Sequence, residues 1–327
     1  MQGLMQDWPL LANRIIDHAA EYHGGREVVS RSVEGPIHRT DYRAINARAR
    51  QLSSALRGHG IAMGDVVGTL AWNTYRHVEV WYGVMGLGAV CHTINPRLFA
   101  DQIVYIANHA EDRLLFVDLT FLPLVESIAD QLPLVKTYVV LTDAGHLADT
   151  SLAVRDGVEV VDYESFISSG DQKFQWVDVD ENTACGLCYT SGTTGNPKGV
   201  LYSHRSTVLH ALACNGTDQI GLRSVDAILP VVPMFHANAW SIIFTAPMAG
   251  AKLVLPGARL DGESIYQMLE AEQVTCTAAV PTIWLMLLQY LEQTGHRPSS
   301  LKRVFIGGAA CPEALIEAFE DRYAIEV

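Results

Sequence analysis

The sequence predicts an α/β protein made of two α/β subdomains with mainly parallel sheets. The chain has 327 residues, which is enough for two lobes, since a single core rarely grows past ~250 to 300 residues. Hydrophobic residues make up 49% of the chain and charged residues 18%, as in a globular protein with much buried strand and helix. Short apolar runs alternate along the chain with segments of helical period.

The clearest helical pattern spans residues 40–60. Thr40 is the expected N-cap, and the helix is expected to stop at Gly58 and Gly60. The apolar residues on one face of this helix are Ile45, Ala49, Leu52 and Leu56.

Strand and helix patterns then alternate, which indicates βαβ units. In the first half, strands are expected at 65–72, 90–95, 113–118 and 137–143, with helices at 75–89 and 122–132. In the second half, strands are expected at 183–190, 227–233, 252–256, 275–281 and 303–308, with a helix at 206–216. The segment 144–180 is richer in Gly, Ser and Asp, so we expect subdomains at 1–180 and 181–327.

The net charge of -13, from 23 basic and 36 acidic residues, argues against a nucleic-acid partner. The N-terminus shows no basic region followed by an uninterrupted apolar stretch, so no secretion signal is predicted and a cytoplasmic location is expected. Residues 227–251 lack charged side chains, but their prolines favour a buried strand, loop and helix over a membrane span.

Six cysteines are present, mostly alone in apolar surroundings. Cys185 and Cys188 form a C-x-x-C, which is either a redox pair or half of a zinc site, but no second pair exists. We therefore expect buried free thiols. No H-E-x-x-H motif or Cys/His cluster at ligand spacing occurs in the sequence, so a zinc site is not supported.

The stretch "YTSGTTGNPKG", residues 189–199, follows the strand expected at 183–190. Ligands bind at the carboxyl ends of parallel strands, and glycines let backbone N–H groups approach an anion. The hydroxyls of the loop and the positive charge of Lys198 add further donors. The loop is therefore predicted to bind phosphate. Its high density of glycine and hydroxyl residues next to a buried strand argues against an ordinary surface loop.

A Walker P-loop is the competing interpretation. It requires glycine before the lysine and Ser or Thr after it, whereas Pro197 precedes Lys198 and Gly199 follows it. The Walker pattern therefore fails.

Extended to residue 206, the stretch "YTSGTTGNPKGVLYSHRS" resembles the phosphate-binding signature of the adenylate-forming superfamily, which includes acyl-CoA synthetases, firefly luciferase and the adenylation domains of peptide synthetases. Three further segments agree in order and spacing: "INPRL" (94–98), "PMFHANAW" (233–240) and "VFIGGAACP" (304–312). The resemblance covers nearly the whole chain and is greatest to medium- and long-chain fatty acyl-CoA ligases, including the methylthiopropionyl-CoA ligase type. It implies the large N-terminal domain of these enzymes.

The resemblance also implies a two-step reaction with ATP, Mg²⁺ and coenzyme A. A carboxylate attacks the α-phosphate of ATP to give an acyl-adenylate and pyrophosphate, and coenzyme A then displaces AMP. Loop N–H groups, Lys198 and Mg²⁺ would offset the repulsion between carboxylate and triphosphate.

By resemblance, particular residues receive roles. Lys198 and His236 are the expected catalytic residues, Thr190 the expected contact to Mg²⁺ and phosphate, and His236 and Trp240 the expected acyl-pocket residues, with Trp240 as a gate. The expected nucleotide-binding residues are Thr190, Ser191, Gly192, Thr193, Thr194, Gly195, Lys198, Ala237, Gly307, Gly308 and Ala309.

The segment 235–240 bears on the substrate. Amino-acid-activating relatives place an acidic residue here to pair with the substrate ammonium, and "FHANAW" has none. An amine-free acid is therefore favoured, with fatty or short thioether acids first and an aryl acid next.

Family members continue past the equivalent of Val327 with an acidic motif, a ribose-binding Asp and a C-terminal domain carrying a lysine for adenylation. The chain is therefore expected to be an incomplete N-terminal portion, inactive alone. The alternative is a non-catalytic nucleotide- or acyl-binding protein. The resemblance also favours a homodimer.

Overall fold

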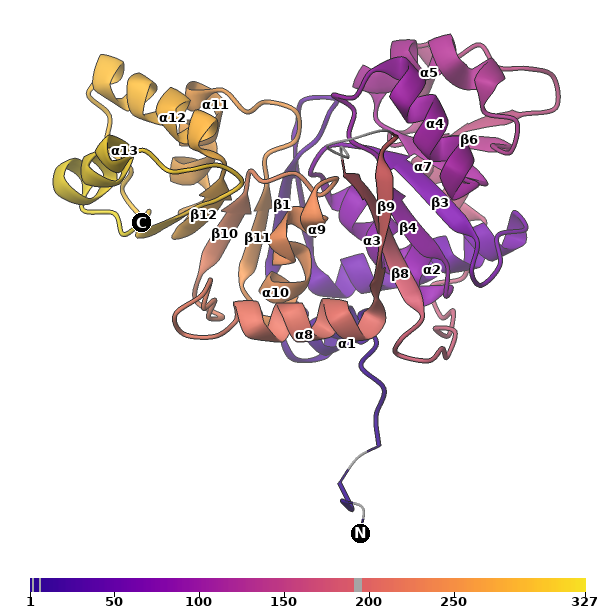
Figure 1. Ribbon diagram of the computed structural model, residues 1–327, viewed down its shortest axis with the longest axis horizontal. Coiled ribbons are helices and arrows are strands. Elements are labelled where there is room, and N and C mark those ends of the chain that lie inside the picture. Colours follow the sequence, from indigo (N-terminus) through magenta and orange to yellow (C-terminus); the bar gives the residue numbers. More distant parts are fainter. Residues whose placement is uncertain (2, 6, 191–195) are drawn as a thin grey trace.

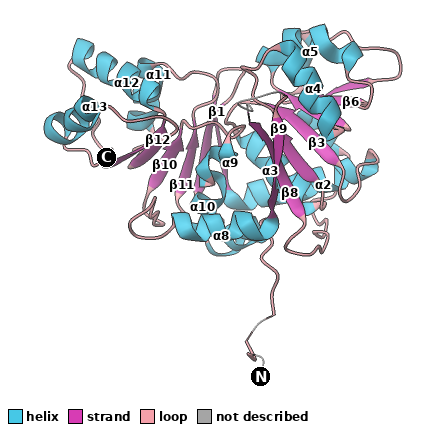
Figure 2. Ribbon diagram, viewed as in Figure 1, coloured by secondary structure: helices cyan, strands magenta, loops and turns pink. Residues whose placement is uncertain are grey.

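The computed structural model describes residues 1, 3–5, 7–190 and 196–327, which form an α/β structure with two sheets (Figure 1, Figure 2). Within the described residues the larger sheet has seven strands and the smaller sheet has six. Neighbouring strands are parallel except for the pairs β1–β2 and β8–β9. The predicted class, α/β with mainly parallel sheets, is confirmed.

In both sheets the spatial order of the strands differs from their order in the sequence. The larger sheet runs β7 (Glu159–Asp162), β6 (Thr137–Val140), β5 (Leu114–Val117), β3 (Val66–Leu70), β4 (Val90–Thr93), β8 (Ala184–Thr190) and β9 (Lys198–Ser203). The smaller sheet runs β13 (Arg303–Ile306), β12 (Cys276–Ala279), β10 (Ala227–Pro230), β11 (Lys252–Leu255), β1 (Glu27–Arg31) and β2 (Ile37–Asp41).

The helices cover both faces of each sheet. Between the sheets lie α1 (Arg14–Tyr22), α2 (Tyr42–Gly58), α3 (Tyr75–Gly86), α8 (His204–Cys214) and α10 (Ile242–Ala249). Outside the larger sheet lie α4 (Ala100–Ala110) and α5 (Leu122–Ile128), and outside the smaller sheet lie α11 (Gly262–Ala271), α12 (Pro281–Thr294) and α13 (Glu313–Glu317). The short helices are η1 (Leu119–Phe121), η2 (Ala129–Gln131), α6 (Ala144–Ala148), α7 (Tyr163–Ser168), α9 (Ala237–Trp240) and η3 (Ala318–Arg322).

A single apolar core joins the facing sides of the two sheets. It contains Val28 of β1 and Leu253 of β11 together with Val67 of β3 and Cys91 of β4, all fully buried. Because both sheets share this core with α2, α3 and α10, their carboxyl ends are held next to each other.

The division between the sheets does not follow the boundary expected at residue 180. Strands β8 and β9 come after that boundary and complete the larger sheet, while the β1–β2 hairpin comes before it and completes the smaller sheet. The exchange arises because β1 pairs in parallel with β11, with Val28 opposite Leu253.

Helix α2 shows how the sequence sets local structure. The expected apolar face is buried, and the helix ends at Gly58 as predicted. The expected N-cap is wrong: Asp41 caps the helix by accepting a hydrogen bond from the N–H of Ala44. Thr40 instead lies in β2, opposite Val28, one residue before the end of the strand at Asp41.

Residues 227–251 form β10, α9 and α10, which confirms the buried strand, loop and helix. In the part of the chain that the structure describes, no helix has both the length and the apolar character needed to span a membrane. All six cysteines are free. Cys185 and Cys188 are buried, and burial raises the pKa of both thiols, as expected for core cysteines.

Candidate functional site

The base of the phosphate-loop candidate is the antiparallel hairpin of β8 and β9. Thr190 at the end of β8 pairs directly with Lys198 at the start of β9. Directly opposed residues share one face of a sheet, with Cβ atoms about 5 Å apart, so both side chains start from the same face of the hairpin. Both side chains are exposed. The residues between them that were predicted to bind nucleotide, Ser191, Gly192, Thr193, Thr194 and Gly195, lie outside the described residues.

The contacts of Cys188 show which part of the molecule this face of the hairpin is turned toward. It lies two residues before Thr190, so the two side chains project to the same side. Its thiol is 3.2 Å from Thr93 Oγ1 and donates to Asn238 Oδ1 at 3.5 Å. Thr190 and Lys198 therefore face the segment that carries His236 and Trp240.

That segment has an unusual backbone. Five consecutive residues have φ angles in the left-handed region: Ala237 (45°), Asn238 (54°), Ala239 (50°), Trp240 (53°) and Ser241 (60°). For L-residues with a Cβ, this conformation costs about 1–2 kcal/mol per residue. Tertiary contacts must therefore hold it in place.

Contacts at both ends of the left-handed segment hold it. Asn238 is buried and accepts the thiol hydrogen bond from Cys188 of β8. Ser241 is buried as well, and its Oγ lies 2.5 Å from His210 Nδ1 on α8. The segment is thus fixed between the larger sheet and the helices that lie between the sheets.

Trp240 contacts the glycine turn that follows β13. A Cβ on Gly307 would lie only 2.8 Å from the ring atom Cη2 of Trp240, so a side chain at this position would collide with the indole. Gly308 and Ala309 continue the turn and are exposed. The structure therefore brings the turn at 307–309 against the segment 236–241.

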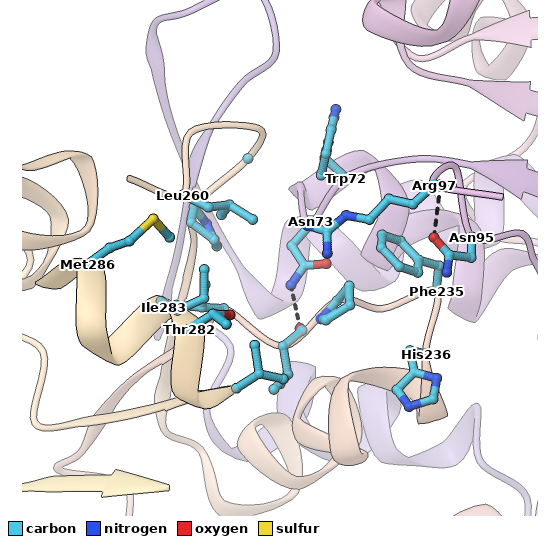
Figure 3. A pocket seen from close by; sticks show the side chains of 16 residues that line it. Trp72, Asn73, Asn95, Arg97, Phe235, His236, Leu260, Thr282, Ile283 and Met286 are labelled. Atoms are coloured by element: carbon cyan, nitrogen blue, oxygen red, sulfur yellow. Dashed lines mark hydrogen bonds between the residues drawn. The ribbon is translucent and has the colours of Figure 1, made fainter. Parts of the chain in front are cut away.

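A cavity of about 430 Å³ lies at the carboxyl ends of strands from both sheets (Figure 3). Asn95 and Arg97, in the "INPRL" segment after β4, line one side, and Phe235 and His236 line another. In Figure 3 the Phe235 ring lies beside Asn95 and Arg97, while the His236 imidazole points away from them.

Asn73 positions this cavity. Its Nδ2 donates to the carbonyl oxygens of Pro230 (2.9 Å) and Val232 (2.8 Å), and its Oδ1 accepts from the N–H of Met234 (2.8 Å). The amide of a residue just after β3 therefore holds the chain that leads from β10 to His236. Sequence reasoning did not single out Asn73; an amide side chain at the end of a buried strand was the only signal.

A second cavity, of about 550 Å³, borders the left-handed segment at Trp240. Trp240 lines it together with Cys214 of α8, Ile220 and Phe305 of β13. His236 thus borders the first cavity and Trp240 the second, so the segment between these residues contributes to both cavities.

Within the described residues, one group of side chains outside this site has the donors for a metal ion: Glu34, Asp143 and His146. Glu34 Oε1 already accepts from Arg76 Nη1 at 2.8 Å and from Thr142 Oγ1 at 2.7 Å. Because the guanidinium neutralises this carboxylate, the group does not need a cation. The metal candidate of the site remains Thr190.

Comparison with known proteins gives consistent matches. A model of the AMP-binding enzyme family matches residues 16–327. The 3-methylmercaptopropionyl-CoA ligase of Ruegeria lacuscaerulensis is 50% identical over 326 residues, covering 100% of this chain and 60% of that protein. The medium-chain-fatty-acid–CoA ligase of Ectopseudomonas oleovorans is 48% identical, covering 100% of this chain and 59% of that protein. The chain thus spans about 60% of the length of these curated relatives.

Solved structures show the same fold. The anthranilate CoA ligase AuaEII, in complex with anthranoyl-AMP, matches with a TM-score of 0.85 and 26% identity, over 98% of this chain and 60% of that one. The inhibitor-bound N-terminal domain of FACL13 from Mycobacterium tuberculosis matches with a TM-score of 0.78 and 24% identity, over 95% of this chain and 73% of that one.

Proposed function

Since the chain belongs to the AMP-binding enzyme family, we propose that it forms the nucleotide- and acid-binding part of an AMP-forming acyl-CoA ligase. The observation that carries this proposal is the convergence of the motif segments. Thr190 and Lys198 face the segment 236–241, the turn at 307–309 packs against that segment, and "INPRL" shares a cavity with His236.

The phosphates of ATP would bind at the end of the β8–β9 hairpin. Lys198 supplies a positive charge and Thr190 a hydroxyl on the same exposed face. This donor set fits a phosphate and the magnesium ion that accompanies it, because Mg²⁺ is bound by oxygen ligands. The ion would offset charge on the departing pyrophosphate, while Lys198 binds phosphate oxygens directly. The turn at Gly307, Gly308 and Ala309 would lie beside the adenine.

The acid would enter by the second cavity, past Trp240. His236 and Ala237 lie at the start of the left-handed segment, and they would contact the acyl carboxylate and the nucleotide. No acidic residue occurs between His236 and Trp240 to pair with a substrate ammonium. We infer an amine-free acid, with fatty or short thioether acids favoured by the relatives' names and an aryl acid as the alternative.

Coenzyme A would approach from the opposite side, through the cavity in Figure 3. The acid and the thiol must reach the adenylate carbonyl from different directions, and the two cavities meet the segment 236–241 at different residues, His236 and Trp240. The first cavity is lined by apolar groups and has one cation, Arg97, among its lining residues, which suits a neutral arm attached to phosphates.

The proposal is tested by titrating the protein with ATP and Mg²⁺ in a calorimeter. Lys198→Ala removes a charge-assisted hydrogen bond worth about 1.5–3 kcal/mol, so the affinity should fall about tenfold or more. The matched control is Lys302→Ala. Lys302 is also exposed, but it lies before the start of β13, whereas the turn at 307–309 follows the end of that strand. Equal affinities for the parent protein and Lys198→Ala would contradict the role of Lys198. No binding by the parent would contradict the proposed site.

A further inference from the structure

Tyr189, the residue before Thr190, makes a contact that the proposed function does not use. Its phenol oxygen lies 2.6 Å from Nδ1 of His109, near the end of α4. The Tyr189 ring packs edge to face against the His109 ring, with centroids 5.8 Å apart, and His109 stacks on Tyr105 one turn earlier in α4. The strand that leads into the phosphate loop is therefore attached to a helix on the outer face of the larger sheet.

The opposite strand leaves room for this ring. Gly199 pairs directly with Tyr189, and a Cβ on Gly199 would lie 3.1 Å from Cζ of the tyrosine. The ring therefore lies across β9 at the glycine that follows Lys198. A side chain at residue 199 would push the phenol away from α4, which gives this glycine of the motif a role distinct from loop flexibility.

The Tyr189 ring also packs against His92, whose side chain is held by a buried carboxylate. His92 of β4 lies below it, with ring centroids 5.2 Å apart. His92 Nδ1 is 2.9 Å from the carboxylate of Asp112, and both side chains are fully buried. Tyr189 is thus confined by β4 below, β9 beside it and α4 at its hydroxyl.

We propose that Tyr189 and His109 are positioning residues of the phosphate site, and that their hydrogen bond ties the base of the loop to α4. Neighbouring side chains of a strand project to opposite faces, so fixing Tyr189 on the α4 face holds Thr190 on the face of Lys198 and Asn238. This inference rests on the proposed function. Among the described strands β9 pairs with β8 alone, so β9 depends on β8, and the pair at residues 189 and 109 ties β8 to α4.

The chemistry of the pair suits this role. Burial raises the pKa of Tyr189 to about 12, so the phenol keeps its proton near neutral pH. It can donate to Nδ1 of His109 in the tautomer that carries the ring proton on Nε2. An asparagine at residue 109 would place an acceptor oxygen near the position of Nδ1, whereas an alanine would not.

The test uses Tyr189→Phe, His109→Ala and the double variant, with ATP and Mg²⁺ as the probe. Each single variant should weaken the affinity about two- to tenfold, as expected for one lost hydrogen bond, and the double variant should be no weaker than either. His109→Asn should restore most of the affinity. The control is Tyr138→Phe, because Tyr138 lies in β6 and its buried hydroxyl has no hydrogen-bond partner in the described structure.

Unchanged affinity in both single variants, or losses that multiply in the double variant, would overturn the proposal. Hydrogen exchange of the β9 amides, measured without ligand, gives a second readout. It should be faster in Tyr189→Phe and His109→Ala but not in Tyr138→Phe, and equal rates would also overturn the proposal. Because this readout needs no ATP, it decides the inference even if the parent protein binds no nucleotide, which would contradict the proposed function instead.

Discussion

The region of α2, β3 and α3 differs sharply from the segment 236–241, although both contribute to the core between the sheets. Helix α2 begins at a capped residue, buries one apolar face and ends at a glycine. Helix α3 has Thr74 as its N-cap and is buried along its whole length. The segment 236–241 instead places five residues with side chains in the left-handed region.

The difference indicates how this fold divides stability from function. In α2 and α3, local preference and tertiary packing favour the same conformation, so these helices add stability. Between Ala237 and Ser241 the local preference opposes the observed backbone, and contacts with Cys188 and His210 hold it. Backbone strain of this kind clusters at functional sites, where it fixes the direction of particular side chains. Here His236 directly precedes the strained residues, and Trp240 is one of them.

The largest expected effect lies in the regular region. Trp81 of α3 is fully buried and packs edge to face on Phe244 of α10, with ring centroids 5.8 Å apart. Trp81→Ala should lower the free energy of unfolding by about 3–5 kcal/mol, from the lost burial and the cavity left behind. Urea unfolding followed by circular dichroism measures this.

The control for Trp81→Ala is Trp8→Ala, because Trp8 is 58% exposed and should change stability little. The affinity for ATP, measured well below the unfolding temperature, should stay near that of the parent in both variants. A large loss of affinity in folded Trp81→Ala would show that the two regions are not separable.

An intermediate effect is expected at Asp118, which follows β5 and contacts Trp72, a residue that lines the first cavity. Asp118 follows β5 and is buried, and its Oδ2 accepts the N–H of Trp72 at 2.6 Å. Burial raises the pKa of Asp118 to about 7, with the nearby Glu34 adding to the rise. The folded state therefore keeps a proton between about pH 4 and 7 that the unfolded chain has lost, so this group lowers stability as the pH rises through that window.

Asp118→Asn replaces the carboxyl with a neutral amide of similar shape. Its free energy of unfolding should equal that of the parent near pH 4 and exceed it by about 4 kcal/mol at pH 8, by the usual conversion of pKa shifts. Urea unfolding of both proteins at several pH values measures the difference. A constant difference across the whole range would show that Asp118 does not titrate in this window.

The smallest expected effect tests the strain itself. Ala237 has a φ of 45°, a conformation that glycine adopts without the Cβ penalty. Ala237→Gly should raise the free energy of unfolding by about 1 kcal/mol, whereas Ala47→Gly in the interior of α2 should lower it by about 1 kcal/mol. Opposite signs in thermal unfolding would support the contrast between the regions. A loss of stability in both variants would contradict it.

Much of the fold was predictable because strand and helix periods are local properties. The strands that contain Val67, Cys91 and Leu253 were expected in the right places, and so were the apolar face and the end of α2. The N-cap was missed by one residue, because the sequence offers Thr40 and Asp41 in succession and does not mark the residue at which β2 ends and α2 begins.

The site was predictable as a set of residues but not as a geometry. The motif residues Lys198, His236 and Trp240 were singled out by their resemblance to family motifs, and their roles stay predictions. The left-handed backbone of the segment 236–241 was not predictable, because tertiary contacts override the preference of its residues. Asn73 and His109 were missed for a related reason: their partners lie far away along the chain, and no local pattern marks them.

One structure would test the roles of the two cavities most directly, that of the protein crystallised with a non-hydrolysable acyl-adenylate such as a fatty acyl sulfamoyl adenosine. We expect the sulfamoyl group near Thr190 and Lys198, the adenine against the turn at 307–309, and the acyl chain passing Trp240 into the second cavity. A ligand bound elsewhere on the protein, or an acyl chain that enters the cavity lined by Asn73 and Arg97, would contradict the assignment of the two cavities and of the strained segment between them.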